Sequence, residues 1–102
     1  MMKMGTSVVR VEHPVPDYAS WKREAFDRDP LGREGSGVRR YRVLRADGDP
    51  TLVAIELEFD NGTQAEAFAV RLLEMWRQVA DRFGWVDVPT ARIYDLTAVE
   101  EY

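Results

Sequence analysis

The sequence predicts an α+β fold: one domain in which a strand, a helix, two strands, a second helix and a last strand follow one another. Four short runs alternate apolar and polar residues, as half-buried strands do, and two longer segments carry apolar residues at helical spacing. The 102 residues suffice for one hydrophobic core but not for two. The chain contains no cysteine, which excludes disulfides and thiolate metal sites.

The first part of the chain is predicted to form a strand and an amphipathic helix. Residues 7–12 alternate, and the strand ends at a His-Pro-Val-Pro segment, because proline cannot continue a hydrogen-bonded ladder. Asp17 then stands at the N-cap position of a helix whose apolar residues recur at helical spacing. We expect this helix to end near residues 28–30 and a glycine-rich loop to follow over residues 31–37.

The middle of the chain predicts a β-hairpin. Residues 38–45 and 51–59 form two alternating runs, and residues 46–50 have the composition of a connecting loop. If the hairpin is symmetric about this loop, Arg40 lies opposite Glu56 at the spacing of a cross-strand pair.

A long helix and a last strand are predicted after the hairpin. Thr63 and Glu66 form a capping box at the start of the helix, and Gly84 ends it. After a turn at Pro89, residues 91–96 form the last strand. The apolar face of the helix is expected to consist of Phe68, Leu72, Met75, Trp76, Val79 and Phe83.

This βαββαβ order is that of the ferredoxin-like fold, a four-stranded antiparallel sheet with both helices on one face. The other face of the sheet is then open. Alternation directs toward the helices the apolar residues Val9, Val11, Tyr41, Val43, Val53, Ile55, Leu57 and Phe59. The same alternation places on the open face Arg10, Glu12, Arg40, Arg42, Glu56 and Glu58. For the last strand the sequence leaves two possibilities, an outward side of Ala91 and Ile93 or one of Arg92, Tyr94 and Leu96.

Three segments carry a family resemblance: VVRVEHPVPDYASWKREAF, GVRRYRVLRADGDPTLVAIELEFDNGTQAEAF and ARIYDL. They resemble small bacterial proteins of the dimeric α+β barrel superfamily, in particular those near the antibiotic-biosynthesis-monooxygenase domain. The resemblance implies a homodimer whose open sheet faces meet and enclose a barrel-like interior that binds substrates. Members of the superfamily catalyse cofactor-free oxygenation of aromatic compounds, cyclisation, haem degradation or isomerisation, and the fold alone does not choose among these activities.

The candidate catalytic residues are His13 and Tyr94. His13, the only histidine, can act as a general base or hold a polar substrate group; the alternative is that it ends the strand and bonds a backbone group. Tyr94 projects into the interior if its side of the last strand is the open one. The candidate substrate-binding residues are Trp76, for which a core role is the alternative, and Arg40, Arg42 and Glu56.

The sequence leaves two functions open. One is a cofactor-independent monooxygenase or cyclase that acts on a hydrophobic aromatic metabolite. The other is a non-enzymatic homodimeric module with a ligand-binding, regulatory or accessory role. We expect no cofactor and no metal. The haem-degrading relatives that the resemblance implies use a histidine ligand on the second long helix, and residues 63–83 contain no histidine, so haem degradation is not expected. The net charge of −4 and the absence of a long apolar stretch predict a cytoplasmic protein that binds neither nucleic acid nor membrane.

Overall fold

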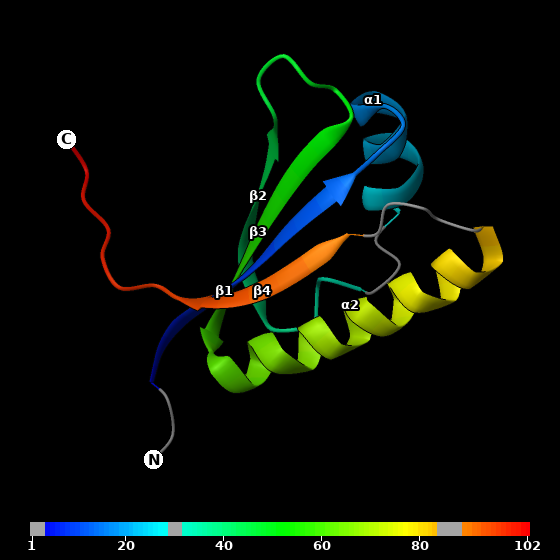
Figure 1. The fold of residues 1–102 in the computed structure, drawn as a ribbon. Helices are drawn as coiled ribbons and strands as arrows, with labels where there is room; N and C mark the ends of the chain where they lie inside the picture. Colours follow the sequence, from blue (N-terminus) through cyan, green and yellow to red (C-terminus); the bar gives the residue numbers. More distant parts are fainter. Residues whose placement is uncertain (1–3, 29–31, 84–88) are drawn as a thin grey trace.

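The computed structural model describes residues 4–28, 32–83 and 89–102, which form an α+β domain built on one four-stranded antiparallel sheet (Figure 1). In chain order the elements are β1 (Met4–Pro14), α1 (Tyr18–Trp21), η1 (Lys22–Phe26), β2 (Val38–Arg45), β3 (Leu52–Asn61), α2 (Gly62–Phe83) and β4 (Thr90–Asp95). The strand order is β2-β3-β1-β4, so the connections from β1 to β2 and from β3 to β4 each skip one strand. Figure 1 shows α1 and α2 on the same side of the sheet.

The first helical segment covers residues 18–26, but only its first four residues are α-helical. The predicted helix end near residues 28–30 lies partly outside the described residues. Asp17 caps this segment as expected, because its carboxylate accepts a hydrogen bond from the backbone N–H of Ser20 at 3.1 Å. However, α1 contains only 4 residues and continues directly into η1, a turn of π-helix. The sheet therefore carries one main helix, α2, and the arrangement departs from the regular βαββαβ pattern in its first crossover.

The π-turn has a packing cause. The N–H of Asp27 donates to the carbonyl of Lys22 at 2.8 Å, which is the wider hydrogen-bonding pattern of a π-turn. In an α-helix, at about 100° per residue, side chains five positions apart point in different directions. The wider turn brings Trp21 and Phe26 to the same side, where their ring centroids are 5.3 Å apart.

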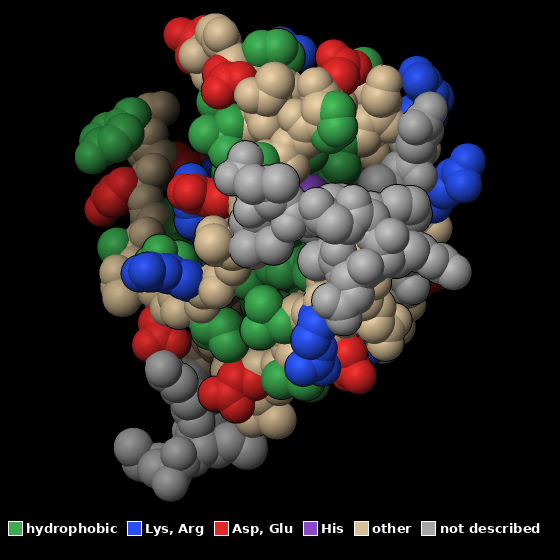
Figure 2. Space-filling model, turned by 45° about the vertical axis from the view of Figure 1, so that its right-hand side comes forward, with side chains coloured by type: hydrophobic (Ala, Val, Ile, Leu, Met, Phe, Trp, Pro, Cys, Tyr) green, Lys and Arg blue, Asp and Glu red, His purple; other side chains and the backbone are tan. Residues whose placement is uncertain are grey.

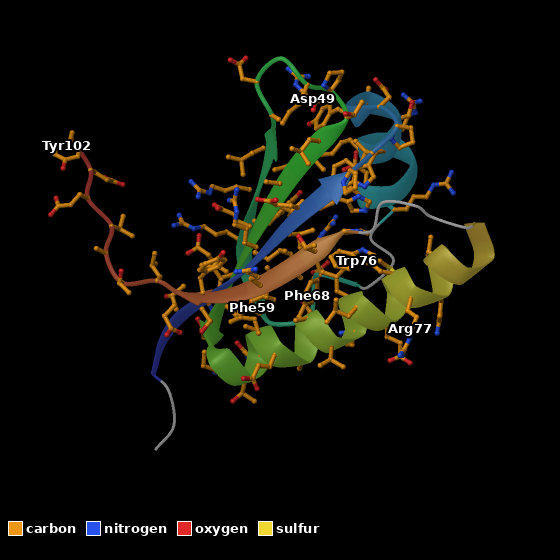
Figure 3. The ribbon with its side chains drawn as sticks, in the orientation of Figure 1. Asp49, Phe59, Phe68, Trp76, Arg77 and Tyr102 are labelled. Atoms are coloured by element: carbon orange, nitrogen blue, oxygen red, sulfur yellow. The ribbon has the colours of Figure 1, made fainter. Side chains whose placement is uncertain are left out.

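The hydrophobic core lies between the sheet and the helical segments. Figure 3 shows Phe59 of β3 and Phe68 of α2 in this layer, and their ring centroids are 5.4 Å apart. The predicted core faces of β1, β3 and α2 are confirmed over the described residues. The buried cluster consists of Val9, Val11, Phe26, Ile55, Leu57, Phe59, Ala65, Phe68, Leu72 and Trp76. The predicted helix end at Gly84 and the side chain of Phe83 lie outside the described residues.

The cap of α2 is two residues earlier than predicted. The side-chain oxygen of Asn61 accepts a hydrogen bond from the backbone N–H of Gln64 at 2.9 Å, so Asn61 is the capping residue. Asn61 is also the last residue of β3. The strand therefore passes into the helix without a loop, and the predicted capping box at Thr63 is wrong.

The register of the β2–β3 hairpin also differs from the prediction. Arg40 lies opposite Glu58, and Arg42 lies opposite Glu56. The predicted pairing of Arg40 with Glu56 is therefore wrong, because the partner of Arg40 is the next outward residue of β3, Glu58.

The loop explains this shift. The N–H of Ala46 donates to the carbonyl of Leu52 at 3.0 Å, so the ladder closes around residues 47–51 instead of residues 46–50. Within the loop the carboxylate of Asp49 accepts from the backbone N–H of Thr51 at 2.9 Å and from its hydroxyl at 2.5 Å. These local bonds favour a turn centred on Asp49.

Candidate functional site

The sheet separates the predicted site residues into two groups. His13 follows Val9 and Val11 in the alternation of β1, and its partner on β3 is the buried Val53, so His13 lies on the helix side. Trp76 lies on the same side. Tyr94 pairs with Val8 and therefore lies on the open face. The two candidate catalytic residues are on opposite faces of the sheet and do not form one site.

His13 lies between two tryptophans. Its ring centroid is 5.7 Å from that of Trp21, the last residue of α1, and 6.0 Å from that of Trp76. Trp76 is only 6% exposed, and Figure 3 shows it between α2 and the sheet. The site forms where the end of β1 passes between α1 and α2, and a small part of the imidazole is visible from outside (Figure 2).

The hydrogen bonding of His13 determines which nitrogen can accept a proton. Its Nδ1 lies 2.8 Å from the carbonyl oxygen of Pro14. A carbonyl only accepts, so Nδ1 carries the hydrogen, and in the neutral ring the lone pair is on Nε2. Burial lowers the pKa of His13, and the bond to Pro14 only partly opposes this effect. At neutral pH the ring is therefore an uncharged proton acceptor among aromatic side chains.

The open face is organised in cross-strand rows. Its outward residues are identified by their pairing across the four strands, from β2 to β4. The first row is Arg40, Glu58, Val8 and Tyr94; the second is Arg42, Glu56, Arg10 and Arg92; the third is Leu44, Ala54, Glu12 and Thr90. The outward side of β4 is therefore that of Arg92 and Tyr94, whereas Ala91 packs against the core.

Ion pairs connect the strands of the open face. Glu56 accepts from Arg42 with one carboxylate oxygen and from Arg10 with the other, and Glu58 accepts from Arg40. The side chain of Glu56 is 17% exposed, whereas that of Arg42 is 66% exposed, so the carboxylate lies beneath the guanidinium. Burial raises the pKa of Glu56, but the bonds from Arg42 and Arg10 outweigh it and hold the pKa below 4.5.

Arg92 differs from the other arginines of this face. It lies directly opposite Arg10 across the β1–β4 pair, and within the described ranges it makes no ion pair. Like charges directly opposite each other on a sheet are destabilising. The β4 side of the open face therefore has an excess of positive charge.

A shallow hollow of about 340 Å³ lies beside the edge strand β2. Its lining consists of Arg33, Glu34, Val38, Arg39, Arg40 and Tyr41. The arginines of this hollow already have partners. Arg40 is bonded to Glu58, Arg39 is 3.5 Å from Asp60, and the guanidinium of Arg33 lies 3.9 Å from the ring centroid of Phe26. The arginines of the hollow are therefore already occupied and leave few groups to bind a charged ligand.

The sequence analysis did not identify Trp21 as a neighbour of His13. The signal was available: the N-cap at Asp17 places Trp21 in the first helical turn after the strand that ends at His13.

Over residues 4–28, 32–83 and 89–102, no three histidine, aspartate or glutamate side chains gather into a metal site. In the same residues no helix has both the length and the apolar character needed to cross a membrane. No protein-family model, no curated protein and no solved structure matches the chain. The comparisons therefore assign no family, and the site has to be interpreted from its own geometry.

Proposed function

We propose that the protein is a homodimeric, cofactor-independent oxygenase or cyclase that binds an aromatic metabolite beside His13, on the helix side of the sheet. The observation that carries the proposal is the state of His13. Burial lowers the pKa of its ring, its Nδ1–H donates to the carbonyl of Pro14, and Trp21 and Trp76 are among its flanking side chains. A base in apolar surroundings suits the removal of a proton from a weakly acidic aromatic compound.

Besides the base on the protein, the reaction needs only O₂ and the substrate. In an anthrone, for example, removal of the acidic C–H proton by Nε2 of His13 leaves a carbanion that reacts with O₂. One oxygen atom becomes the new carbonyl oxygen, and the other leaves as water. Trp21 and Trp76 provide flat apolar surfaces beside the base. The π-turn that follows Trp21 supports the assignment, because such turns are frequent at functional sites.

The fold-level part of the proposal is a ferredoxin-like domain of the dimeric α+β barrel type. Two observations support it: both helical connections skip one strand, and the helices lie on one side of the sheet. The open face suits contact with a second copy, because Leu44 and Tyr94 are exposed there and the glutamates are already paired. Burial of paired charges costs much less than burial of unpaired ones. Sedimentation is expected to give twice the protomer mass of 11.7 kDa, and a mass of 11.7 kDa would contradict the dimer.

Oxygen consumption with an anthrone as the probe tests the chemistry. In His13→Asn the amide nitrogen takes the position of Nδ1 and can still donate to Pro14, but the base at Nε2 is lost. We expect the rate to fall by about 10²- to 10⁴-fold, with little change in KM because the tryptophans are retained. Val70→Thr, an exposed position of α2, is the matched control. An unchanged rate in His13→Asn would refute the assignment of His13 as the base.

A non-enzymatic ligand-binding module is the second candidate. The observation that favours it is that Trp21 and Trp76 place two flat apolar surfaces beside His13, which suit the binding of an aromatic ligand without any reaction. The same probe separates the two functions. Quenching of tryptophan fluorescence without oxygen consumption in the unmodified protein would establish binding and contradict the enzyme.

A further inference from the structure

The segment after β4, residues 97–102, extends from the sheet as an arm. The backbone N–H of Leu96 donates to the carbonyl of Thr6 at 3.0 Å, and this bond holds the chain to β1 up to that point. Beyond it every residue of the arm is exposed, including the apolar Val99 at 65%. Figure 1 shows the arm, in red, standing away from the sheet on the side opposite α2.

The arm lies on the open-face side of the sheet, and its length would allow it to reach the far edge. It leaves from β4 at one edge, whereas Arg40 belongs to β2 at the other edge. The pKa of Arg40 is raised mainly by its hydrogen bond to Glu58, but the charge of Glu101 contributes as well, so Glu101 lies within electrostatic range of β2. Three strand spacings of about 4.8 Å make about 14 Å, and five extended residues reach about 17 Å. The arm is long enough to cross the sheet, yet its side chains do not pack on it.

The arm and the open face have complementary charges. The arm carries Glu100 and Glu101 and no basic residue. The open face carries Arg92, opposite Arg10 and without an ion pair among the residues that the structure describes. To reach Arg92 of its own chain the arm would have to reverse tightly over β4, and residues 97–102 contain no Gly, Pro, Asn or Asp to form such a turn.

We propose that the arm is exchanged: in the homodimer each arm binds the open face of the partner copy, where Glu100 and Glu101 pair with its exposed arginines and Val99 becomes covered. This inference rests on the homodimer proposed above. A second sheet stacked on the open face lies about 10 Å away, which places it within reach of a segment that stands off its own sheet.

Isotope-coded cross-linking tests the exchange. Copies with a benzoylphenylalanine photo-cross-linker at position 99 are mixed with an excess of ¹⁵N-labelled unmodified copies and irradiated. We expect cross-linked peptides that join an unlabelled arm to a labelled open-face strand. Cross-links confined to unlabelled peptides would show that the arm binds its own chain and would overturn the inference, as would a dimer in which position 99 forms no cross-link to the labelled copy.

The double variant Glu100→Gln with Glu101→Gln gives an independent measurement. We expect the Kd of the dimer to rise roughly tenfold at low salt and less at high salt, because the added ion pairs are partly exposed. Glu74→Gln, an exposed position of α2, is the matched control. A dimer with an unchanged Kd and no mixed-isotope cross-links would refute the exchange alone, whereas a monomeric protein would refute the homodimer as well.

Discussion

The double ion pair of Glu56 allows a quantitative test of how the open face is stabilised. Glu56→Gln keeps the shape of the side chain but removes the charge that holds Arg10 and Arg42. Arg10 is 35% exposed, and we assign its bond to Glu56 about 1 kcal/mol; Arg42 is 66% exposed, and solvent screening limits its bond to about 0.5 kcal/mol. The lost attraction also leaves Arg10 beside Arg92. We therefore expect the free energy of unfolding to fall by about 1–2 kcal/mol at neutral pH.

Urea unfolding followed by tryptophan fluorescence measures this loss. It is done at one protomer concentration, because the proposed dimerisation would add to the apparent stability. Glu12→Gln is the control: Glu12 is 60% exposed and 3.9 Å from Arg10, so its loss should cost less than about 0.5 kcal/mol. The folded pKa of Glu56 is below 4.5, so its contribution is present above pH 4.5 and is lost as the pH falls through the folded pKa. An equal loss in both variants, or a Glu56→Gln difference that persists at the lowest pH, would refute the reasoning.

Three further predictions concern single residues. The pKa of His13 is lower in the folded state than the ordinary value of 6.5, so the unfolded state takes up a proton first as the pH falls. The free energy of unfolding should therefore decrease as the pH drops below 6.5. His13→Asn should remove this pH dependence. Gly37 and Gly48 both have positive φ, but a Cβ at Gly37 would lie 3.0 Å from the Gln64 side chain. We expect Gly48→Ala to lower the free energy of unfolding by about 1 kcal/mol and Gly37→Ala to lower it by more. Equal urea midpoints for the two variants would contradict this. Among the described residues the buried hydroxyl of Ser7 has no hydrogen-bond partner, so Ser7→Ala should raise the free energy of unfolding by about 1 kcal/mol. A lower urea midpoint in this variant would contradict the prediction.

Periodicity predicted the faces of the strands because a half-buried strand has to alternate. Val9, Ile55 and Phe59 are buried as the pattern requires, and the open-face residues lie on the other side. The first crossover was not predictable in the same way. Its π-turn depends on Trp21 and Phe26 reaching the same part of the sheet, which is a tertiary contact that spacing alone does not reveal.

The predictions of the hairpin loop and of the helix cap were wrong for a different reason. In each place, several neighbouring residues had side chains suited to the same role. Asn61 and Thr63 are both good caps, and Asn61 forms the observed bond. In the hairpin, the side chain of Asp49 determines which residues close the loop, and this shifts the whole register of the arginines. Such choices depend on small differences between local hydrogen bonds, which a pattern of residue types does not resolve.

The candidate site was predicted only in part. The face of His13 follows from the alternation of β1, since it continues the series of Val9 and Val11, so its separation from an outward Tyr94 could have been inferred. The outward side of β4 could not be inferred from the sequence, because both faces of this strand carry apolar residues and the strand is an exposed edge of the sheet.

The two faces of the sheet suit different tasks because of how their charges are arranged. On the open face the carboxylates of Glu56 and Glu58 are occupied by arginines, so they have little capacity left to accept a proton from a substrate. His13 lies on the other side among aromatic rings, where burial keeps it uncharged. The proposed chemistry and the proposed assembly therefore rest on separate residues. Glu56→Gln should change the Kd of the dimer and leave proton abstraction intact, whereas His13→Asn should do the reverse; a variant series in which both properties change together would mean that the two faces are coupled through the sheet.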